Sequence, residues 1–416
     1  MQNLSSPLAT TLTNGIRLIA EQVPLEAVSV NLWFNVGSAL ETDEINGIAH
    51  FLEHMVFKGS DKVKLGEFEH AVESCGGNTN AATSHDYTNY YITIAPQDFA
   101  RLAPLQLDVV MHTAIPPAEF ERERLVVLEE IRRSNDNPDR RIYRQVSEIA
   151  HPSLPYRRCV LGPTEVIENL TPEQMRQFHR TWYVPEHLTI TCVGNLPAEE
   201  MMTALKNWCE ELPPLAPPTR PQFTADPPFR EREAYFLQDA RLQQARLVMV
   251  WRVPGWQDFR ETLKLTMLAG ILGGGMTARL VQDLREQRRL VERISVSYMP
   301  QVWQGTFQIL AKLPPDNIPT VEQAIGEHLV RLQNELIPEP EIRKIRAQVA
   351  SRFVFANESP RDRASIYGYY DRVVQNLTAA HTYPELINQI TSAELQQTAQ
   401  KLLNPNAYGI LQVTAN

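Results

Sequence analysis

The chain has 416 residues, a formal net charge of −9 at pH 7 and 21% charged residues. This length exceeds what one hydrophobic core usually supports, so we expect a globular protein of two or more domains. The acidic balance and the lack of a long basic run argue against nucleic acid as a principal partner. No apolar stretch approaches the length of a membrane span, which argues against a membrane partner.

Two features bear on the cellular compartment. Residues 1–7 have neither the basic start nor the apolar core of a signal peptide. The four cysteines form no Cys-x-x-Cys pair, which fits a reducing environment rather than a thiolate zinc site. We therefore expect a cytoplasmic protein, although a protein of an organellar matrix whose targeting segment has been removed would look the same.

The first elements are predicted to be strands. Asn14-Gly15 is a hairpin turn signal between two β-rich runs, and residues 28–36 form a third run. The stretch 47–59 is predicted to lie in a buried helix, with Asp43 as a plausible N-cap. Gly47 is expected inside this helix, where it costs about 1 kcal/mol relative to alanine, so it should pack closely against another element.

This helix contains the motif His50-Phe-Leu-Glu53-His54. Histidines four residues apart place both imidazoles on one helix face, and Glu53 shares that face. A catalytic zinc needs neutral nitrogen ligands and a base for the metal-bound water, and the order His-x-x-Glu-His is typical of inverted zinc peptidases. Taken alone, the motif leaves open a structural helix with two core histidines and a solvated glutamate.

Residues 78–94 are predicted to form a polar strand followed by an aromatic one. The ordinary interpretation is an exposed sheet edge whose polarity prevents aggregation. The functional interpretation is an edge that pairs with an extended peptide by strand addition. The residues themselves are compatible with both.

A third zinc ligand should come from a second helix, because an open catalytic site uses three protein ligands and one water. Helices are expected over 98–115, 117–137 and 139–150. On the charged helix 117–137, Glu123 and Glu130 are seven residues apart, two turns along one face, and Glu129 is an alternative. The spacing alone does not choose among them.

A proline-rich segment marks the clearest domain boundary. A proline-rich segment is extended and does not pack into a compact core. We therefore predict a domain over 1–211, a linker over 212–228 and a second domain over 229–416. Before the linker, Thr171-Pro172 predicts a helix start with proline at the first position. The second half repeats the first in outline, but has no His-x-x-Glu-His motif. Its triple-glycine segment lacks the Lys-Ser or Lys-Thr of a phosphate-binding loop, which argues against nucleotide binding. The order of predicted strands and helices indicates an α+β protein in two halves.

Over nearly its whole length the chain resembles the pitrilysin family of zinc peptidases, in the short-chain branch that includes the β subunit of the mitochondrial processing peptidase. The resemblance rests on the zinc motif, the acidic helix, the Gly76–Ser84 segment, Leu161-Gly-Pro and Trp182-Tyr-Val-Pro. It implies an α+β fold with two homologous domains, each a mostly antiparallel sheet with helices packed on one face. Only the first domain would bind zinc, one ion per chain.

The resemblance also implies roles for individual residues. It assigns three zinc ligands, namely His50, His54 and Glu130. Glu129 is the competing third ligand, Glu53 would be the general base, and Glu123 would support catalysis. The substrate backbone would lie along Asn80, Ala81 and Ala82. The implied activity is hydrolysis of peptide bonds in short or unfolded peptides.

One part of the family pattern differs. Family members usually carry an arginine and, seven positions on, a tyrosine that stabilise the substrate carbonyl as it becomes an oxyanion. Arg285 is in register, but Glu292 occupies the tyrosine position and Arg289 replaces the usual glycine. Tyr298 lies six residues further along a predicted strand and need not point the same way.

A carboxylate repels an oxyanion, so an active site with Glu292 at the tyrosine position should catalyse peptide hydrolysis poorly by itself. The resemblance therefore implies a heterodimer, in which a homologous chain supplies the arginine and tyrosine. A homodimer is less favoured, since it would bring Glu292 into each site.

Two other functional classes stay open. Some family relatives are non-catalytic scaffold or assembly subunits, but those relatives lose zinc ligands that this sequence keeps. A zinc hydrolase acting on something other than peptides is compatible with the metal motif, whereas the edge strand and the duplicated architecture favour peptides.

Overall fold

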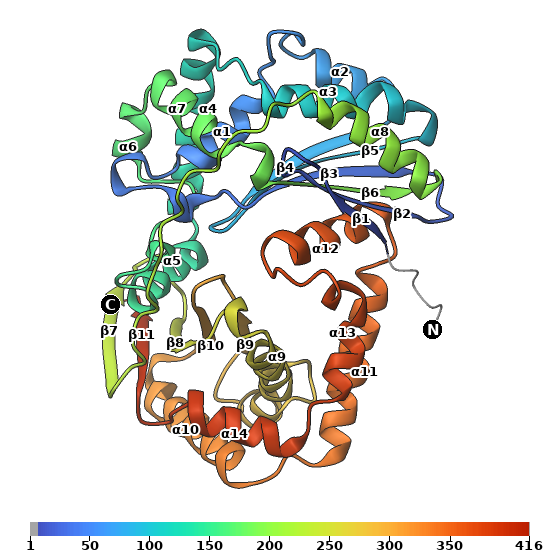
Figure 1. Cartoon of the computed structure of the whole chain (residues 1–416). Helices are drawn as coiled ribbons and strands as arrows, with labels where there is room; N and C mark the ends of the chain where they lie inside the picture. The colour runs from blue at the N-terminus through green and yellow to red at the C-terminus, as the bar shows by residue number, and fades with distance from the viewer. Residues whose placement is uncertain (1–6, 416) are drawn as a thin grey trace. The chain divides into compact units, whose positions relative to one another are not determined.

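The computed structural model describes residues 7–415, which fold into two compact units (Figure 1). Unit 1 contains the described residues up to Ser134 together with Arg158–Gln222 and Val354–His381. Unit 2 contains Asn135–Arg157, Phe223–Phe353 and the described residues from Thr382 onward. The units therefore differ from a contiguous division at residues 211 and 229, because each half of the chain contributes one segment to the other unit.

A six-stranded sheet forms the centre of unit 1. Its order is β1-β2-β6-β3-β5-β4, and neighbours are antiparallel except β2 and β6, which are parallel. The strands are β1 (Leu8–Thr11), β2 (Arg17–Gln22), β3 (Val28–Phe34), β4 (Asn78–Thr83), β5 (Thr88–Ile94) and β6 (Leu188–Gly194). The predicted Asn14-Gly15 turn is confirmed, because β1 pairs antiparallel with β2 and Gly15 adopts the left-handed φ of +94°.

Strand β3 is buried along its whole length because helices cover both faces of the sheet. Its even-numbered residues join the core formed with α1 (Ile48–Val56) and α3 (Phe99–Met111). Its odd-numbered residues face α12 (Pro360–Arg372): the Asn31 amide lies 2.9 Å from the Ser365 hydroxyl, and Trp33 packs edge-on against Tyr369. The α+β class and the mostly antiparallel sheet are confirmed, whereas the expected single helical face is not.

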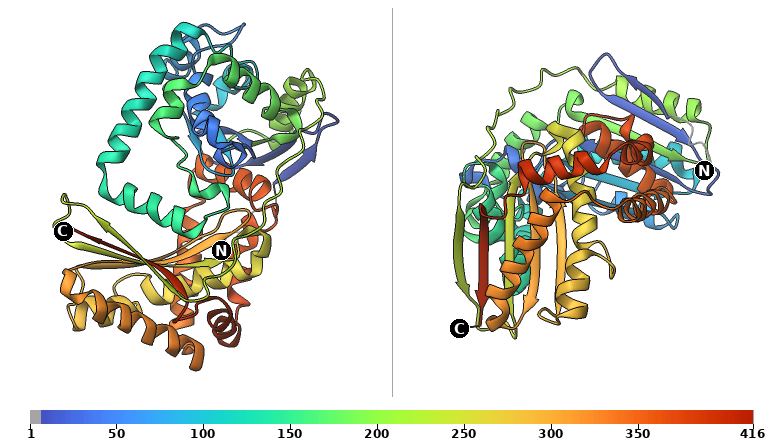
Figure 2. Two further views of the ribbon diagram at one scale, coloured as in Figure 1. Left: turned by 90° about the vertical axis from the view of Figure 1, so that its left-hand side faces the viewer. Right: turned by 90° about the horizontal axis from the view of Figure 1, so that it is seen from below.

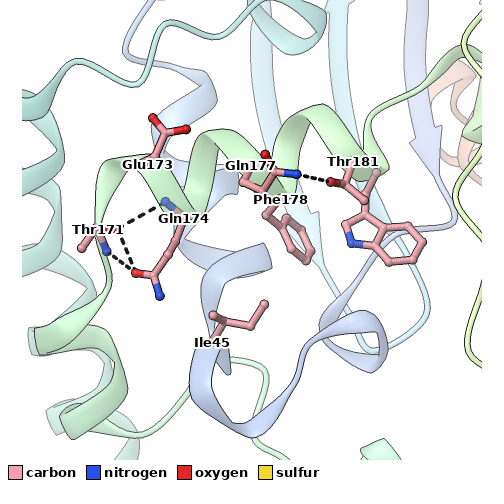
Figure 3. Close-up of a pocket in the computed structure, with 8 residues that line it drawn as sticks. Ile45, Thr171, Glu173, Gln174, Gln177, Phe178 and Thr181 are labelled. Atoms are coloured by element: carbon pink, nitrogen blue, oxygen red, sulfur yellow. Dashed lines mark hydrogen bonds between the residues drawn. The ribbon is translucent and has the colours of Figure 1, made fainter.

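The other helices that begin in unit 1 are α2 (Glu67–Glu73), α4 (Pro117–Asp136), α6 (Thr164–Asn169), α7 (Pro172–Trp182), α8 (Ala198–Glu210) and α13 (Ala379–Asn388). Helix α7 starts as predicted. Thr171 Oγ1 accepts from the Gln174 backbone N–H at 3.2 Å, and Gln174 Oε1 accepts from the Thr171 N–H at 2.9 Å (Figure 3). With Ile45, this helix lines a pocket of about 500 Å³ that contains none of the predicted site residues.

The sheet of unit 2 repeats the topology of unit 1. Its order is β7-β11-β8-β10-β9, and the single parallel pair is β7 with β11. This corresponds strand by strand to β2-β6-β3-β5-β4, so β1 is the one addition in unit 1. The strands are β7 (Arg232–Gln238), β8 (Ala245–Val253), β9 (Arg293–Met299), β10 (Gly305–Leu313) and β11 (Tyr408–Thr414). The repeated order supports the predicted duplication.

Helices α5 (Pro138–Ala150) and α12 explain the discontinuous units. They occupy equivalent places in the two repeats: α5 is the third α-helix after β5, and α12 is the third α-helix after β10. Yet α5 packs on β8 and β11 in unit 2, and α12 packs on β3 and β6 in unit 1. Apolar residues Ile142 and Val146 of α5 form a core with Val248 and Val250. Each half of the chain therefore sends one helix to the sheet of the other half.

The other helices of unit 2 are α9 (Phe259–Gly273), α10 (Ile318–Asn334), α11 (Glu339–Phe355) and α14 (Ser392–Leu402). They share a core with β8 and β10 on the sheet face opposite α5 (Figure 2). The predicted linker, 212–228, contains no helix or strand. Within residues 7–415, no helix has both the length and the apolar character needed to cross a bilayer.

Candidate metal centre

Helix α1 carries the His-x-x-Glu-His motif and begins immediately after Gly47. Gly47 is the N-cap, with a left-handed φ of +99°, and does not lie inside the helix as predicted. A Cβ here would approach the carbonyl oxygen of Leu161 to 2.6 Å, so the close packing is against the Leu161-Gly162 turn. The predicted N-cap role of Asp43 is wrong, because Asp43 lies in a separate 3-10 turn and pairs with Arg158 at 3.1 Å.

Glu41 satisfies the first turn of α1 instead. Its buried carboxylate accepts hydrogen bonds from the backbone N–H groups of Gly47 (2.8 Å) and Ala49 (2.9 Å) and from the Asn46 side chain (2.7 Å). Burial raises the pKa of Glu41 to about 7, although these hydrogen bonds oppose the rise. Sequence reasoning missed this residue because it lies six residues before the N-cap, outside the usual capping spacing.

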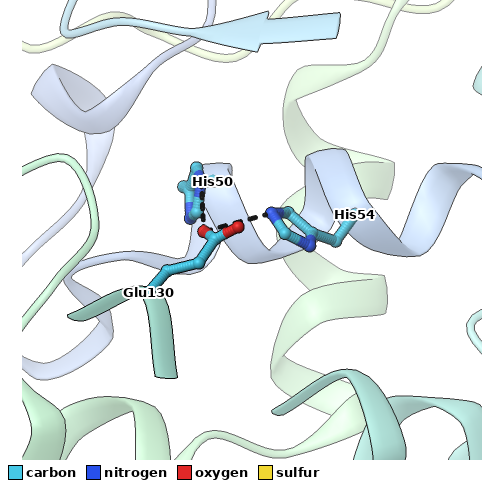
Figure 4. Close-up of side chains that lie close together, drawn as sticks. All are labelled: His50, His54 and Glu130. Atoms are coloured by element: carbon cyan, nitrogen blue, oxygen red, sulfur yellow. Dashed lines mark ion pairs between the residues drawn. The ribbon is translucent and has the colours of Figure 1, made fainter. Parts of the chain in front are cut away.

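The structure brings His50, His54 and Glu130 together from two helices (Figure 4). The two histidines project from one face of α1, and Glu130 reaches them from α4. Glu130 Oε2 lies 3.5 Å from His50 Nε2 and 3.6 Å from His54 Nε2. The competing Glu129 is instead held by ion pairs with arginines of its own helix, Arg132 at 2.7 Å and Arg133 at 3.0 Å.

These three residues fit a zinc ion in donor type, spacing and charge. Separations of 3.5 and 3.6 Å are too long for hydrogen bonds. They match the distance of about 3.4 Å between two donors that each bind one tetrahedral zinc at about 2.0–2.2 Å. Burial, together with the neighbouring His54, lowers the pKa of His50 to about 3, which keeps this imidazole neutral as a metal ligand must be.

Glu123 orients His54 through Nδ1, the ring nitrogen that does not face Glu130. Its Oε1 accepts a hydrogen bond from His54 Nδ1 at 2.8 Å, and its Oε2 pairs with Lys58 Nζ at 2.7 Å. The hydrogen bond from His54, with the Lys58 charge, lowers the pKa of Glu123 to about 2. Because Nδ1 is engaged, Nε2 is the nitrogen left for a metal. The contribution of Lys58 has no signal in the sequence motif.

Glu53 occupies a partly buried position beside the candidate ligands His54 and Glu130. Burial raises its pKa, while a hydrogen bond from Thr83 Oγ1 to its Oε2, at 2.5 Å, opposes the rise. The nearby charge of His54 also favours the carboxylate form. A carboxylate held in this way is a suitable acceptor for a proton from a reacting water molecule.

Known protein families match this chain in two consecutive segments. Residues 17–164 match the model described as insulinase (peptidase family M16), and residues 169–349 match the model of the peptidase M16 inactive domain. The chain belongs to peptidase family M16. The family predicted from the sequence, also called the pitrilysin family, is therefore confirmed; the closer resemblance to the processing peptidase β subunit stays a prediction.

Relatives of this M16 family member extend over almost its whole length. The uncharacterized zinc protease YmxG of Bacillus subtilis is 26% identical over 392 residues, which cover 93% of this chain and 92% of that protein. A protease structure from Helicobacter pylori has a TM-score of 0.91 and 24% identity, covering 99% of this chain and 100% of that chain. A structure from Pseudomonas fluorescens, described as a peptidase M16 inactive domain, has a TM-score of 0.85 and 18% identity, with 98% of both chains covered. The structural likenesses establish the fold.

The predicted substrate residues of this M16 family member lie on a free sheet edge. β4 ends the sheet of unit 1 and pairs with β5 on one side. Asn80, Ala81 and Ala82 belong to this strand, and α1 packs against it. An edge strand presents unpaired backbone groups that an extended peptide can meet. Peptide binding by these three residues stays a prediction.

The predicted oxyanion residues of this M16 family member lie in unit 2. Arg285 belongs to the π-helical turn Val281–Gln287 and donates to Glu286 at 2.7 Å. Glu292 pairs with Lys312 at 2.7 Å. Tyr298 donates its hydroxyl to the Pro254 carbonyl at 2.7 Å. This tyrosine is thus engaged within unit 2.

Proposed function

We propose that this chain is a zinc metalloendopeptidase that hydrolyses short or unfolded peptides and binds one zinc ion. The observation that carries the proposal is the convergence of His50, His54 and Glu130, whose candidate ligand atoms all lie within 4.8 Å of one another. The zinc protease names of relatives with matching length support the choice of metal. In this proposal, bound zinc polarises the scissile carbonyl and makes the attacking water more acidic.

The protein residues supply the remaining chemistry. Glu53 accepts the proton of the attacking water, and Oε1 is the suitable atom because Thr83 holds Oε2. Glu123 fixes the orientation of His54 and acts outside the ligand set. The backbone of Asn80, Ala81 and Ala82 on β4 binds the substrate as an added strand, which requires an extended peptide and so disfavours folded proteins.

The decisive experiment combines zinc analysis with a fluorogenic, unstructured peptide. We expect about one zinc per chain, cleavage that a chelator abolishes, and no cleavage by Glu53→Gln although it keeps its zinc. His54→Ala should lose zinc. Glu129→Gln is the matched control on α4 and should keep both zinc and activity, because Glu129 pairs with arginines. Full activity in Glu53→Gln would show that the base is assigned wrongly.

We also propose that the active form is a heterodimer in which a homologous chain supplies an arginine and a tyrosine for the oxyanion. Two observations support this: Glu292 is paired with Lys312, and the Tyr298 hydroxyl is bonded to Pro254. The test is to identify a co-purifying chain of similar mass and to compare activity with and without it. Robust zinc-dependent cleavage by the isolated chain would refute the heterodimer.

The competing function is a non-catalytic scaffold of the same family. The carboxylate at position 292 is the observation that favours it, since a carboxylate cannot stabilise an oxyanion. Zinc stoichiometry near zero, with no cleavage in the presence of the copurified partner, is the outcome that supports a scaffold. Stoichiometric zinc with chelator-sensitive cleavage excludes it.

A further inference from the structure

We infer that Thr83 is a positioning residue that fixes the carboxylate of Glu53 for proton transfer. The inference deepens the proposed function and rests on Glu53 being the base. Thr83 is the last residue of the edge strand β4, and its hydroxyl lies 2.5 Å from Glu53 Oε2. The two residues are thirty positions apart in the chain.

The direction of this hydrogen bond follows from its acceptor, because an ionised carboxylate has no proton to donate. Thr88 on β5 is the register partner of Thr83, and their hydroxyl oxygens lie 3.5 Å apart. Thr88 donates its only hydroxyl proton to the Val36 carbonyl at 2.8 Å. Toward Thr83 it could then act only as an acceptor, and at 3.5 Å it is a much poorer one than the Glu53 carboxylate at 2.5 Å, so the Thr83 hydroxyl donates to Glu53.

A glutamate side chain needs such a partner to act as a base with a defined geometry. It has three rotatable bonds, and proton transfer requires the acceptor within hydrogen-bond reach of the reacting water. The contact with Thr83 engages one oxygen and orients the other.

The position of Thr83 also links substrate binding to the base. Asn80, Ala81 and Ala82, the residues expected to pair with the peptide, immediately precede it on the same strand. A shift of β4 would therefore move the hydrogen-bond donor of Glu53 together with the surface that binds the peptide. The geometry makes a clear kinetic distinction: a loss of base orientation lowers kcat, whereas a loss of strand pairing raises KM.

The test compares Thr83→Val, which keeps the shape and removes the donor, with Thr83→Ser, which keeps the donor. We expect Thr83→Val to lower kcat about 10- to 100-fold with KM within about twofold of wild type. Thr83→Ser should restore kcat to within about threefold of wild type. Thr79→Val is the matched control, because Thr79 shares the strand and its face but donates to the Tyr91 carbonyl at 3.2 Å. It should leave kcat unchanged.

Two readouts do not depend on turnover. Zinc content and zinc affinity of Thr83→Val should equal those of wild type, because Thr83 contacts the base and not the candidate ligands. In zinc-free protein, we compare the effect of Thr83→Val on the urea midpoint in wild type and in the Glu53→Ala variant. The midpoint should fall less in the Glu53→Ala variant, because that variant already lacks the hydrogen bond between Thr83 and Glu53.

The outcomes separate this inference from the proposed function. If Glu53→Gln retains full activity, the proposed function is wrong. If Glu53→Gln is inactive but Thr83→Val cleaves like wild type, or Thr83→Ser fails to restore kcat, only the positioning role is wrong. A raised KM with normal kcat in Thr83→Val, or equal midpoint shifts in both backgrounds, also overturns it.

Discussion

His54 has different partners at its two ring nitrogens: Nδ1 donates to Glu123 at 2.8 Å, and Nε2 faces Glu130 at 3.6 Å. Lys58 holds the second oxygen of Glu123 at 2.7 Å, so the carboxylate is fixed from both sides. Glu123 and Glu130 both come from α4, two turns apart. One helix thus supplies a candidate ligand and the group that orients another ligand.

The Glu123→Gln variant should bind zinc about 10- to 100-fold more weakly than wild type, because His54 loses a charged hydrogen-bond acceptor and Lys58 loses its ion pair. Competition with a chromogenic chelator measures this affinity. Glu129→Gln makes the same charge change on the same helix and should leave zinc affinity unchanged. Equal affinities in the Glu123 variant and wild type would contradict the orienting role.

The raised pKa of Glu41 predicts how the stability of the fold changes with pH. Its pKa of about 7 in the folded protein lies above the ordinary carboxyl value of 4.5. Between these values the folded state keeps a proton that the unfolded state releases, so this group's contribution to the free energy of unfolding falls as pH rises, by about 3 kcal/mol in total. Glu41→Gln removes this titration.

Urea unfolding of zinc-free wild type and Glu41→Gln, repeated from pH 4.5 to 7, measures the effect. The wild type should lose stability relative to the variant across this window as pH rises, because only the wild type must ionise a buried carboxyl. A difference between the two proteins that stays constant with pH would show that Glu41 titrates normally in the fold.

The sequence was most informative where contacts are local or follow a regular period. The spacing of His50, Glu53 and His54 predicts one helix face, and the structure places all three on α1. The same helical period relates Glu123 to Glu130, which lie two turns apart on α4. The choice of Glu130 over Glu129 needed the family register, and the arginine pairs of Glu129 show the physical reason for it.

The contacts that sequence reasoning missed are long-range or depend on backbone conformation. Thr83 meets Glu53 only because β4 lies beside α1. The exchange of α5 and α12 between the two sheets leaves no periodic signal, since an amphipathic helix does not specify which sheet covers it. Gly47 was expected inside a helix because its left-handed φ cannot be read from an apolar pattern.

Arg289 makes a stability prediction. It has a φ of +53°, in the left-handed region where glycine is favoured, and the family resemblance places a glycine at this position. Arg289→Gly should therefore raise the free energy of unfolding by about 1 kcal/mol, since the relief of strain exceeds the added flexibility of the unfolded chain. Its neighbour Arg288, with φ of −83°, is the control: Arg288→Gly should lower stability by about 0.5–1 kcal/mol. Denaturant unfolding distinguishes the two, and the same sign for both would contradict the strain.

Two helix glycines should respond oppositely to alanine. A Cβ at Gly368 of α12 would collide with the indole of Trp33, whereas a Cβ at Gly326 of α10 would meet no atom within 4 Å. Trp33 cannot yield easily, because it is buried and packs against Tyr87 and Tyr369.

Gly368→Ala should therefore lower the free energy of unfolding by about 1–3 kcal/mol, the usual effect of overpacking. Gly326→Ala should raise it by about 0.4–1 kcal/mol, because alanine restricts the unfolded chain and favours the helix. Urea unfolding monitored by tryptophan fluorescence and by circular dichroism measures both variants. Because α12 packs on the face of β3 opposite α1, Gly368→Ala should still bind zinc when it is folded. Equal stability of Gly368→Ala and wild type would mean that α12 does not pack on β3 as closely as described.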